Sequence, residues 1–349
     1  MSSALTVVGP SGGFNAAGVA LHHGGGHPEQ PARINAAMAG VAEVASELGE
    51  SLELIPTVPA PSEALLRVHT ADHLARLETL CRTGGGNLDP DTFAGVDSWD
   101  AALLSAGGGL QAVASLRDRG SGAAFVVTRP PGHHALADRA MGFCLLNNVA
   151  VTAAALVAEG ERVCIVDWDV HHGNGTQDIF WDNPSVLYVS THQSPFYPGT
   201  GWANQVGGPE ASGLTVNVPL PAGATGDVVL RALEEVAAPV VEAFAPTWVL
   251  ISAGFDAHRA DPLAQLSLSS ADFGQLARVV AGFAPTDGRV LALLEGGYDL
   301  GALTSSTAAT LRSLVGAAFS GDEAPTSGGP GDEAVRQTIA ARQRALDSL

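Results

Sequence analysis

The stretch Val166-Asp167-Trp168-Asp169-Val170-His171-His172-Gly173-Asn174-Gly175 is the part of this chain that is most informative about its fold and chemistry. It continues the apolar run 163–166, which is typical of a buried strand, and its two glycines predict that the strand ends there. Because side chains alternate along a strand, we expect Asp167, Asp169 and His171 on one face.

Two carboxylates and an imidazole at the end of a buried strand need a partner, because uncompensated buried charge is costly. A divalent metal ion is one such partner, and this set of ligands suits zinc or iron(II). A hydrogen-bonded cluster in the core is the alternative that the stretch alone leaves open.

The composition excludes several classes of protein. The chain has 349 residues, of which 46% are hydrophobic and 15% charged, with 42 glycines, as expected for a large, loop-rich globular enzyme. The formal net charge of −19 argues against direct nucleic-acid binding. We expect no membrane span and no secretory signal. Cys81, Cys144 and Cys164 form no Cys-x-x-Cys pair, which indicates a reducing compartment and a cytoplasmic protein.

Strand and helix patterns alternate along the chain. Strands are predicted over 124–127, 163–168, 186–190, 216–220, 248–252 and 289–295, and helices over about 33–49, 98–117, 147–158, 227–243, 270–283 and 302–318. This order predicts an α/β domain with a mostly parallel sheet and helices on both faces. We expect one domain over 1–319, followed by a linker and a C-terminal helix over 320–349.

Other segments carry weaker signals. Residues 1–15 contain a short apolar run to which we assign no strand, and residues 83–98 are predicted to form a loop. The glycine triplet 107–109 predicts close helix packing. His22, His23 and His27 lie in a glycine-rich loop without fixed ligand spacing, so we interpret them as surface residues rather than metal ligands.

Polar residues follow four of the predicted strands, and together they contain the groups that amide hydrolysis requires. A metal held by two carboxylates and one imidazole keeps an open position and activates water. Either His133 or His134 can move the protons, because imidazole titrates near neutral pH. A carboxylate behind one histidine would keep it basic, and the hydroxyl of Tyr298 can stabilise an oxyanion.

The chain resembles the zinc-dependent histone deacetylase superfamily, which has an arginase-like fold and includes acetylpolyamine amidohydrolases and acetoin utilisation proteins. The resemblance covers about residues 15–318. It is carried by the strings Arg129-Pro130-Pro131-Gly132-His133-His134, Met141-Gly142-Phe143-Cys144-Leu145-Leu146-Asn147-Asn148, Asp167-Trp168-Asp169-Val170-His171-His172-Gly173-Asn174-Gly175-Thr176-Gln177, Ser252-Ala253-Gly254-Phe255-Asp256 and Glu295-Gly296-Gly297-Tyr298. It implies a single-domain arginase/deacetylase-like α/β fold with the active site at the carboxyl ends of the strands.

The resemblance also implies roles for individual residues. One zinc ion would be held by Asp169, His171 and Asp256. His134 would be the general base and then the general acid, and Tyr298 would bind the substrate carbonyl. His133, paired with Asp167, would be an electrostatic helper. Residues implied to bind substrate are Arg33 near the acetate exit, Asp91 at the rim, Gly142, Phe143, Tyr197 and Leu263. A structural potassium site would use Asp167, Asp169, His171, Ser190 and Thr191, largely through backbone carbonyls. Hydroxamate-type inhibitors are expected to bind.

This sequence departs from the family pattern at informative positions. Asn174 stands behind His134 where class I members carry Asp, which together with Trp168 resembles class II and should leave His134 less basic. Leu263 stands where the polyamine-selective branch has an acidic gatekeeper, and the 83–98 loop lacks that branch's insertion. Tyr197 takes the place of a second channel Phe.

The first hypothesis is therefore removal of acetyl or another short acyl group from lysine side chains of a peptide or protein. Deacetylation of polyamines or other small acetylated amines is the alternative. A binding module without turnover is disfavoured because no catalytic residue is missing, and a binuclear manganese enzyme is disfavoured by the ligand set. The sequence leaves open the physiological substrate, the preferred acyl length, zinc or iron, the oligomeric state and the role of residues 320–349.

Overall fold

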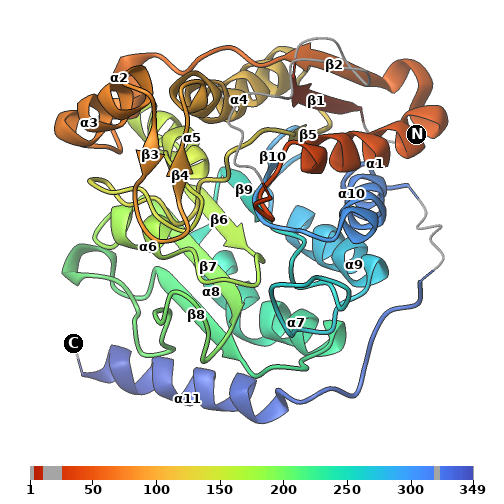
Figure 1. Cartoon of the computed structure of the whole chain (residues 1–349). Helices are drawn as coiled ribbons and strands as arrows, with labels where there is room; N and C mark the ends of the chain where they lie inside the picture. Colours follow the sequence, from red (N-terminus) through yellow and green to blue (C-terminus); the bar gives the residue numbers. More distant parts are fainter. Residues whose placement is uncertain (1–3, 11–25, 318–322, 349) are drawn as a thin grey trace.

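Eight parallel strands form one sheet in the order β2-β1-β5-β10-β9-β6-β7-β8 (Figure 1). The computed structural model of the protein describes residues 4–10, 26–317 and 323–348. Every neighbouring pair in the sheet is parallel, which confirms the α/β fold predicted from the sequence. The strands are β1 (Leu5–Gly9), β2 (Leu52–Pro56), β5 (Ala123–Val126), β6 (Val163–Asp167), β7 (Val186–Gln193), β8 (Thr215–Leu220), β9 (Trp248–Ala253) and β10 (Val290–Leu294).

Helices cover both faces of the sheet and form two hydrophobic clusters with it. Along β6, Cys164 and Val166 belong to one cluster, whereas Val163 and Ile165 belong to the other. Burial on both faces explains why these strands are apolar at every position. The first face is covered by α1 (Ala32–Leu48), α7 (Gly226–Ala232), α8 (Ala238–Phe244), α9 (Ser270–Ala281) and α10 (Leu300–Leu314). The second is covered by α2 (Ser62–Leu66), α3 (Ala71–Arg82), α4 (Ser98–Arg119), α5 (Asn148–Ala158) and α6 (Asn174–Ile179).

Some local predictions are wrong. Residues 1–15 do contain a strand, β1, which the sheet stabilises by pairing it with β2 on one side and β5 on the other. The predicted loop 83–98 contains a small antiparallel hairpin of β3 (Gly86–Asn87) and β4 (Phe93–Ala94). The predicted helix 227–243 is confirmed as a helical segment, but its middle turn is π-helical (Leu233–Ala237) before α8, where Pro239 cannot donate a backbone hydrogen bond.

The glycine triplet in α4 packs closely against its neighbours, as predicted. A Cβ atom added to Gly109 would lie 1.9 Å from Oγ1 of Thr152 in α5, and one on Gly107 would lie 1.9 Å from the carbonyl oxygen of Val58. Neither contact is possible for a larger residue, so these glycines allow α4 to lie directly on α5 and on the segment after β2.

The last helix, α11 (Asp332–Asp347), lies along β8 at the edge of the sheet, at the bottom of Figure 1. Val335 and Thr338 are buried in this contact. The guanidinium group of Arg342 donates to the backbone carbonyls of Gly213 and Thr215. The helix therefore covers an edge strand whose polar backbone groups would otherwise be open to pairing with another chain.

Glu323 ties the segment before α11 to the loop that follows Asp256. Its Oε2 atom lies 3.0 Å from Nε2 of His258 and accepts hydrogen bonds from the backbone N–H and the hydroxyl of Ser270, both at 2.8 Å. Its Oε1 atom lies 2.5 Å from Nη2 of Arg259. The C-terminal segment is thus fixed to the loop between β9 and α9.

Replacing Glu323 with Gln is expected to lower the free energy of unfolding by about 1–2 kcal/mol at pH 7, a value reduced because the carboxylate is 25% exposed. Burial would raise the pKa of Glu323, but hydrogen bonds from Ser270, His258 and Arg259 outweigh burial and lower the pKa from 4.5 to about 2. A carboxylate with a lowered folded-state pKa stabilises the protein above pH 4.5, and this contribution is lost as the pH falls towards 2.

Urea unfolding of both proteins at neutral and acidic pH measures this effect. The difference between wild type and Glu323→Gln should shrink as the pH falls below 4.5. The exposed Glu234, changed to Gln, is the control and should leave stability unchanged. A difference that stays constant down to acidic pH would contradict the assigned ion pairs.

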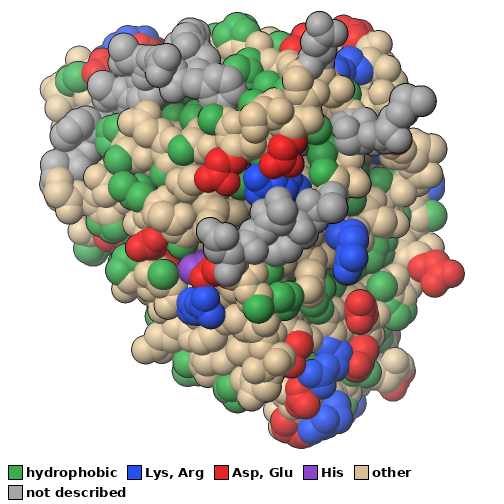
Figure 2. Space-filling view, turned by 90° about the vertical axis from the view of Figure 1, so that its right-hand side faces the viewer, with side chains coloured by type: hydrophobic (Ala, Val, Ile, Leu, Met, Phe, Trp, Pro, Cys, Tyr) green, Lys and Arg blue, Asp and Glu red, His purple; other side chains and the backbone are tan. Residues whose placement is uncertain are grey.

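The distribution of basic side chains on the surface and the character of the helices agree with what the net charge and composition predict. On the face drawn in Figure 2, the described basic side chains stand singly or beside acidic ones, unlike the continuous basic stripe that binds a phosphate backbone. Within the described ranges, no helix has the length and apolar character needed to cross a membrane.

Candidate metal centre and active site

The four central strands of the sheet, β5, β10, β9 and β6, are all followed by polar side chains. Because these strands are parallel, their carboxyl ends lie at one edge, where open α/β sheets bind ligands. The residues that follow them, all predicted from the sequence, are His133 and His134 after β5, Tyr298 after β10, Asp256 after β9, and Asp169 and His171 after β6.

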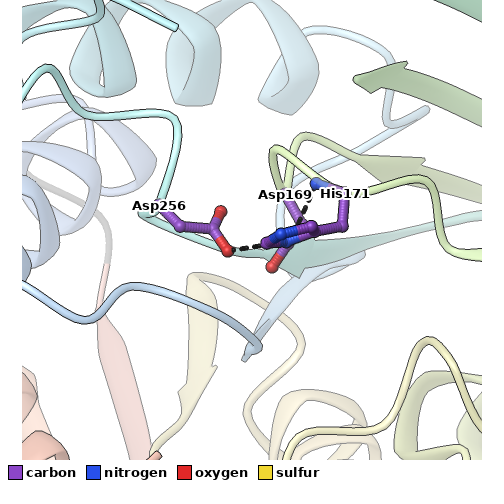
Figure 3. A group of neighbouring side chains, drawn as sticks. All are labelled: Asp169, His171 and Asp256. Atoms are coloured by element: carbon purple, nitrogen blue, oxygen red, sulfur yellow. Dashed lines mark hydrogen bonds and ion pairs between the residues drawn. The ribbon is translucent and has the colours of Figure 1, made fainter. Parts of the chain in front are cut away.

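Asp169, His171 and Asp256 form a compact triad, in which one potential ligand atom from each residue lies within 4.8 Å of the others. The Nδ1 atom of His171 is 3.1 Å from Asp169 Oδ1 and 3.2 Å from Asp256 Oδ2. Figure 3 shows the three side chains pointing towards one another from two loops. Both carboxylates are fully buried, and the imidazole is 12% exposed.

The charges of this triad fit a divalent cation. The two carboxylates share one Nδ1 atom, which can carry only one proton. Burial alone would lower the pKa of His171, but hydrogen bonds to Asp169 and Asp256 raise it to about 10. Burial, together with the charge of Asp169, raises the pKa of Asp256 to about 7. A cation bound by these atoms would compensate both carboxylates, and two oxygens with one nitrogen are a donor set that suits zinc or iron(II).

The prediction that the carboxylates and the imidazole alternate along one strand face is wrong, because β6 ends at Asp167. Backbone N–H groups orient the carboxylates instead. Val170 N donates to Asp256 Oδ1 at 2.9 Å, and Gly296 N donates to Asp169 Oδ2 at 2.8 Å. The loops after β6, β9 and β10 therefore hold the triad together through hydrogen bonds between them.

His133 and His134 lie side by side next to the triad, with ring centres 4.0 Å apart. The Nδ1 atom of His133 is 3.0 Å from Asp167 Oδ2, and the Nδ1 atom of His134 is 2.8 Å from Asn174 Oδ1. Because each Nδ1 faces an oxygen acceptor, a proton on Nδ1 leaves the Nε2 atom of the same ring free to accept another.

The environments of these two histidines shift their pKa values in opposite directions. Burial would lower the pKa of His133, but the charges of Asp169 and Asp167 outweigh burial and raise it well above its ordinary value. Burial lowers the pKa of His134 well below its ordinary value, and the charges of His133 and His171 lower it further. The neutral amide of Asn174 adds no charge, in line with the expectation of a weakly basic His134.

Of the residues predicted to line a channel, Tyr197 lies beside His134 and Phe143 lies beside Tyr298. The ring of Tyr197 meets that of His134 edge-on at 5.2 Å, and the ring of Phe143 meets that of Tyr298 edge-on at 5.9 Å. Tyr197 is 39% exposed, so this aromatic wall reaches the surface.

The backbone at Gly142 and Phe143 is left-handed, with φ of +56° and +67°. A Cβ on Gly142 would lie 2.4 Å from Cδ2 of His134, so glycine is required there. Phe143 has a side chain, and this conformation costs it about 1–2 kcal/mol. Its N–H donates to Oγ1 of Thr92 at 3.0 Å, which helps to hold the turn that presents the aromatic ring.

The interpretation of His27 as a surface residue is wrong, because its side chain is half-buried and packs beside the site. Its imidazole packs edge-on against Phe143 with ring centres 4.5 Å apart, and its Nε2 atom is 3.1 Å from the backbone oxygen of Asp91. The side chain of Asp91 is exposed, and its role at the rim of the site stays a prediction. His22 and His23 lie outside the described residues.

Tyr298 is 9% exposed, and the guanidinium group of Arg33 lies 5.0 Å from its ring centre. Arg33 is completely buried. Its Nε atom donates to the carbonyl of Gly297 at 2.6 Å, its Nη2 atom donates to the carbonyl of Glu295, and its Nη1 atom pairs with Glu29 at 3.2 Å. Arg33 therefore fixes the backbone on the N-terminal side of Tyr298.

The remaining predicted residues lie near these groups. Ser190 in β7 pairs in register with Asp167 in β6, and Thr191 follows it; all three are buried. A potassium ion at this place stays a prediction. Leu263 is half-buried and lies in the loop that begins with Asp256, the third predicted ligand. It is the residue at the position where the polyamine-selective branch has an acidic gatekeeper.

Three buried carboxylates near the site are absent from the predicted set. Glu29 pairs with Arg129 at 2.5 Å, Asp261 Oδ2 accepts the N–H of Tyr298 at 2.6 Å, and Glu295 accepts two backbone N–H groups after β5. A signal existed for Glu295, since it directly follows a buried apolar strand. Arg129 is 100 positions from Glu29 and Tyr298 is 37 positions from Asp261, so no local pattern reveals these two contacts.

Comparison with known proteins adds independent evidence. The profile described as the histone deacetylase domain matches residues 27–314. A probable deacetylase of Archaeoglobus fulgidus is 39% identical over 294 residues, which cover 83% of this chain and 82% of the relative. The histone deacetylase-like amidohydrolase of Pseudomonas aeruginosa is 39% identical over 279 residues, which cover 78% of this chain and 73% of the relative.

A further relative and a solved structure are also similar to this chain. Histone deacetylase 15 of Arabidopsis thaliana is 40% identical over 295 residues, which cover 83% of this chain and 53% of that longer protein. The crystal structure of the HDA15 HD domain matches with a TM-score of 0.86 and 35% identity, covering 99% of this chain and 96% of that one. These similarities place the protein among the deacetylases and related amidohydrolases, which are hydrolases. The chain belongs to the histone deacetylase family.

Proposed function

We propose that this protein is a zinc-dependent amidohydrolase that removes acetyl or another short acyl group from lysine side chains. The observation that carries the proposal is the arrangement of the triad and the histidines. The ligand atoms of Asp169, His171 and Asp256 lie within 4.8 Å of one another, and the ring of His134 lies 5.9 Å from that of His171. A base that is not itself in the triad stands next to it, as water activation requires.

In this proposal the triad residues hold the zinc ion, which when bound polarises the amide carbonyl and lowers the pKa of water. His134 takes a proton from the attacking water at Nε2 and then donates it to the leaving amine. Its low pKa keeps it neutral and able to accept that proton, and Asn174 fixes its orientation.

His133 and Tyr298 supply positive charge and a hydrogen-bond donor. His133, whose pKa is raised, stays protonated against Asp167 and stabilises negative charge that develops beside it. The hydroxyl of Tyr298 donates to the substrate oxygen. Potassium beside Asp167, Ser190 and Thr191 belongs to the same proposal and has a structural role.

The substrate reaches these groups past aromatic residues. Phe143 and Tyr197 pack against the apolar stem of the acylated lysine, and Asp91 accepts hydrogen bonds from the substrate backbone at the rim. Leu263 offers no charge to a polyamine, which favours the lysine substrate over acetylated polyamines. Acetylated polyamines are the alternative substrate, because the acidic residues Asp89 and Asp91 in the loop between β3 and β4 would attract a cation.

The test compares two substrates with the zinc-loaded and the chelated protein. One substrate is a peptide with an acetyl-lysine coupled to a fluorogenic group, and the other is acetylated putrescine. We expect hydrolysis of the peptide, loss of activity on chelation, and recovery with zinc. Iron(II) is added to a parallel sample to compare the two metals.

The variant Asp256→Asn is the matched control, since it keeps the shape of the side chain and removes one charged ligand. It should lose both zinc and activity while unfolding at a similar urea concentration. Hydrolysis of acetylated putrescine alone would favour the alternative substrate. Full activity after complete metal removal would exclude the metal-dependent mechanism.

A further inference from the structure

His133 and His134 occupy the two central positions of a tight turn after β5. The turn is closed by a hydrogen bond from the N–H of Ala135 to the carbonyl of Gly132 at 3.0 Å. Its second half is held by the N–H of Thr176, which donates to the carbonyl of His133 at 3.2 Å. The placement of both imidazoles therefore depends on how this turn is anchored.

The first half of the turn is anchored by a side chain from another strand. Glu295 follows β10, and its Oε2 atom accepts the N–H of Gly132 at 2.6 Å and the N–H of His133 at 3.1 Å. Its Oε1 atom is buried and has no hydrogen-bond partner among the described residues. One oxygen of this carboxylate thus makes both contacts to the turn.

The backbone of Glu295 is itself held firmly. Its N–H donates to the carbonyl of Ala253 in β9 at 3.1 Å, and its carbonyl accepts from the guanidinium group of Arg33. The side chain is completely buried, and burial raises its pKa to about 7. Burying a carboxylate is costly for folding, so its presence beside the two histidines calls for a role that offsets this cost.

We propose that Glu295 is a positioning residue for His133 and His134. Its Oε2 atom fixes the start of the turn 132–135 and so places His133 against Asp167 and His134 beside the triad. The inference rests on the proposed function in assigning a reaction to these histidines. It deepens that function, since Glu295 acts through two peptide N–H groups and not through contact with the substrate.

Three substitutions of Glu295 separate the effect of its side-chain length, which lets an oxygen contact the turn, from the effect of its charge. Glu295→Gln keeps the reach, because its single carbonyl oxygen can take the place of Oε2, but it removes the charge. Glu295→Asp keeps the charge and is one methylene too short to reach the turn. Glu295→Met has neither the acceptor nor the charge and fills a similar volume.

Positioning by one oxygen predicts a specific order of activities. We expect kcat of Glu295→Gln within about threefold of wild type, and kcat of Glu295→Asp and Glu295→Met lower by about 10- to 100-fold, as for a misplaced catalytic group. KM, zinc content and hydroxamate affinity should stay close to wild type in all three, because the triad keeps its hydrogen bonds. Loss of activity in Gln with full activity in Asp would show a role for the charge and overturn the inference. Full activity in Met would overturn it as well.

A measurement without substrate keeps the inference testable apart from the proposed function. The Nδ1 proton that His133 shares with Asp167 is followed by NMR in protein with ¹⁵N-labelled histidine. Its resonance should be displaced least in Glu295→Gln, which keeps the contact with the turn and removes only a charge that acts on His133, and more in Glu295→Asp and Glu295→Met. The same resonance in all four proteins would overturn the inference even if the wild type deacylates lysine. If the wild type hydrolyses neither substrate, the proposed function fails, and the resonance still decides the role of Glu295.

Discussion

Replacing His134 with Ala is expected to lower kcat for deacylation by about 1,000-fold, within the range that general acid–base catalysis supplies. The Nε2 atom of His134 is the proton acceptor in the proposed mechanism. His172 also has a pKa that burial lowers well below its ordinary value, but its two ring nitrogens are engaged by Thr200 and Gln177. His133 cannot substitute, since the charges of Asp169 and Asp167 keep its pKa high. Steady-state kinetics on the acetyl-lysine peptide measures the effect.

The controls separate lost chemistry from lost structure. Zinc content and hydroxamate affinity should be retained in His134→Ala, because the ring of His134 lies 5.9 Å from that of His171 and is not part of the triad. Asn174→Ala leaves the imidazole in place and removes only its partner, so a smaller loss of about tenfold is expected. Equal activity of His134→Ala and wild type would exclude His134 as the base.

Replacing Tyr298 with Phe is expected to lower kcat by about 100- to 1,000-fold, the effect of removing one donor to a developing oxyanion. The substitution deletes a single hydroxyl from a ring that Arg33 and Phe143 hold in place. Zinc binding and the free energy of unfolding should change little, because Tyr298 is not a member of the triad. The rate on the acetyl-lysine peptide and the urea midpoint are the two measurements.

Tyr197→Phe is the matched control for this substitution. Tyr197 also lies next to the histidines, but its ring and not its hydroxyl contributes to the aromatic wall. We therefore expect its kcat to stay within about threefold of wild type, as for a surface polar group of small energetic effect. If the two variants lost activity equally, the hydroxyl of Tyr298 would have no special role in the reaction.

The pKa values of His133 and His134 are shifted in opposite directions, which is the basis of the prediction for His134→Ala. A pair of titratable groups pushed in opposite directions by their surroundings divides into one charged and one neutral member at the same pH. Here the charges of Asp169 and Asp167 raise the pKa of His133 and favour its charged form, while burial and the charges of His133 and His171 lower the pKa of His134 and favour its neutral form. The two imidazoles are thus suited to different tasks although they are adjacent in the chain.

Much of the fold could be predicted from local patterns. Apolar runs bounded by glycine and polar residues predict β5, β6, β7, β9 and β10, because strands buried on both faces must be apolar throughout. The central stretch 166–175 and the polar residues after three further strands predict the site edge. The edge strand β2 and the short hairpin β3–β4 were not predicted from the sequence, because pairing with other segments stabilises them more than the propensities of their own residues do.

By itself, the sequence determined the α/β class, and its resemblance to a known family predicted that Asp169, His171 and Asp256 lie together, because both depend on residue types and their order along the chain. Only the tertiary structure decided how that triad is held, since β6 ends at Asp167 and backbone donors from neighbouring loops orient Asp169 and Asp256. It also revealed Glu295 as the anchor of the histidine turn, whose partners lie 162 and 163 positions away. Hydrogen bonds between segments so distant in the chain leave no local pattern, and they exist only once the parallel strands have brought their carboxyl ends to one edge.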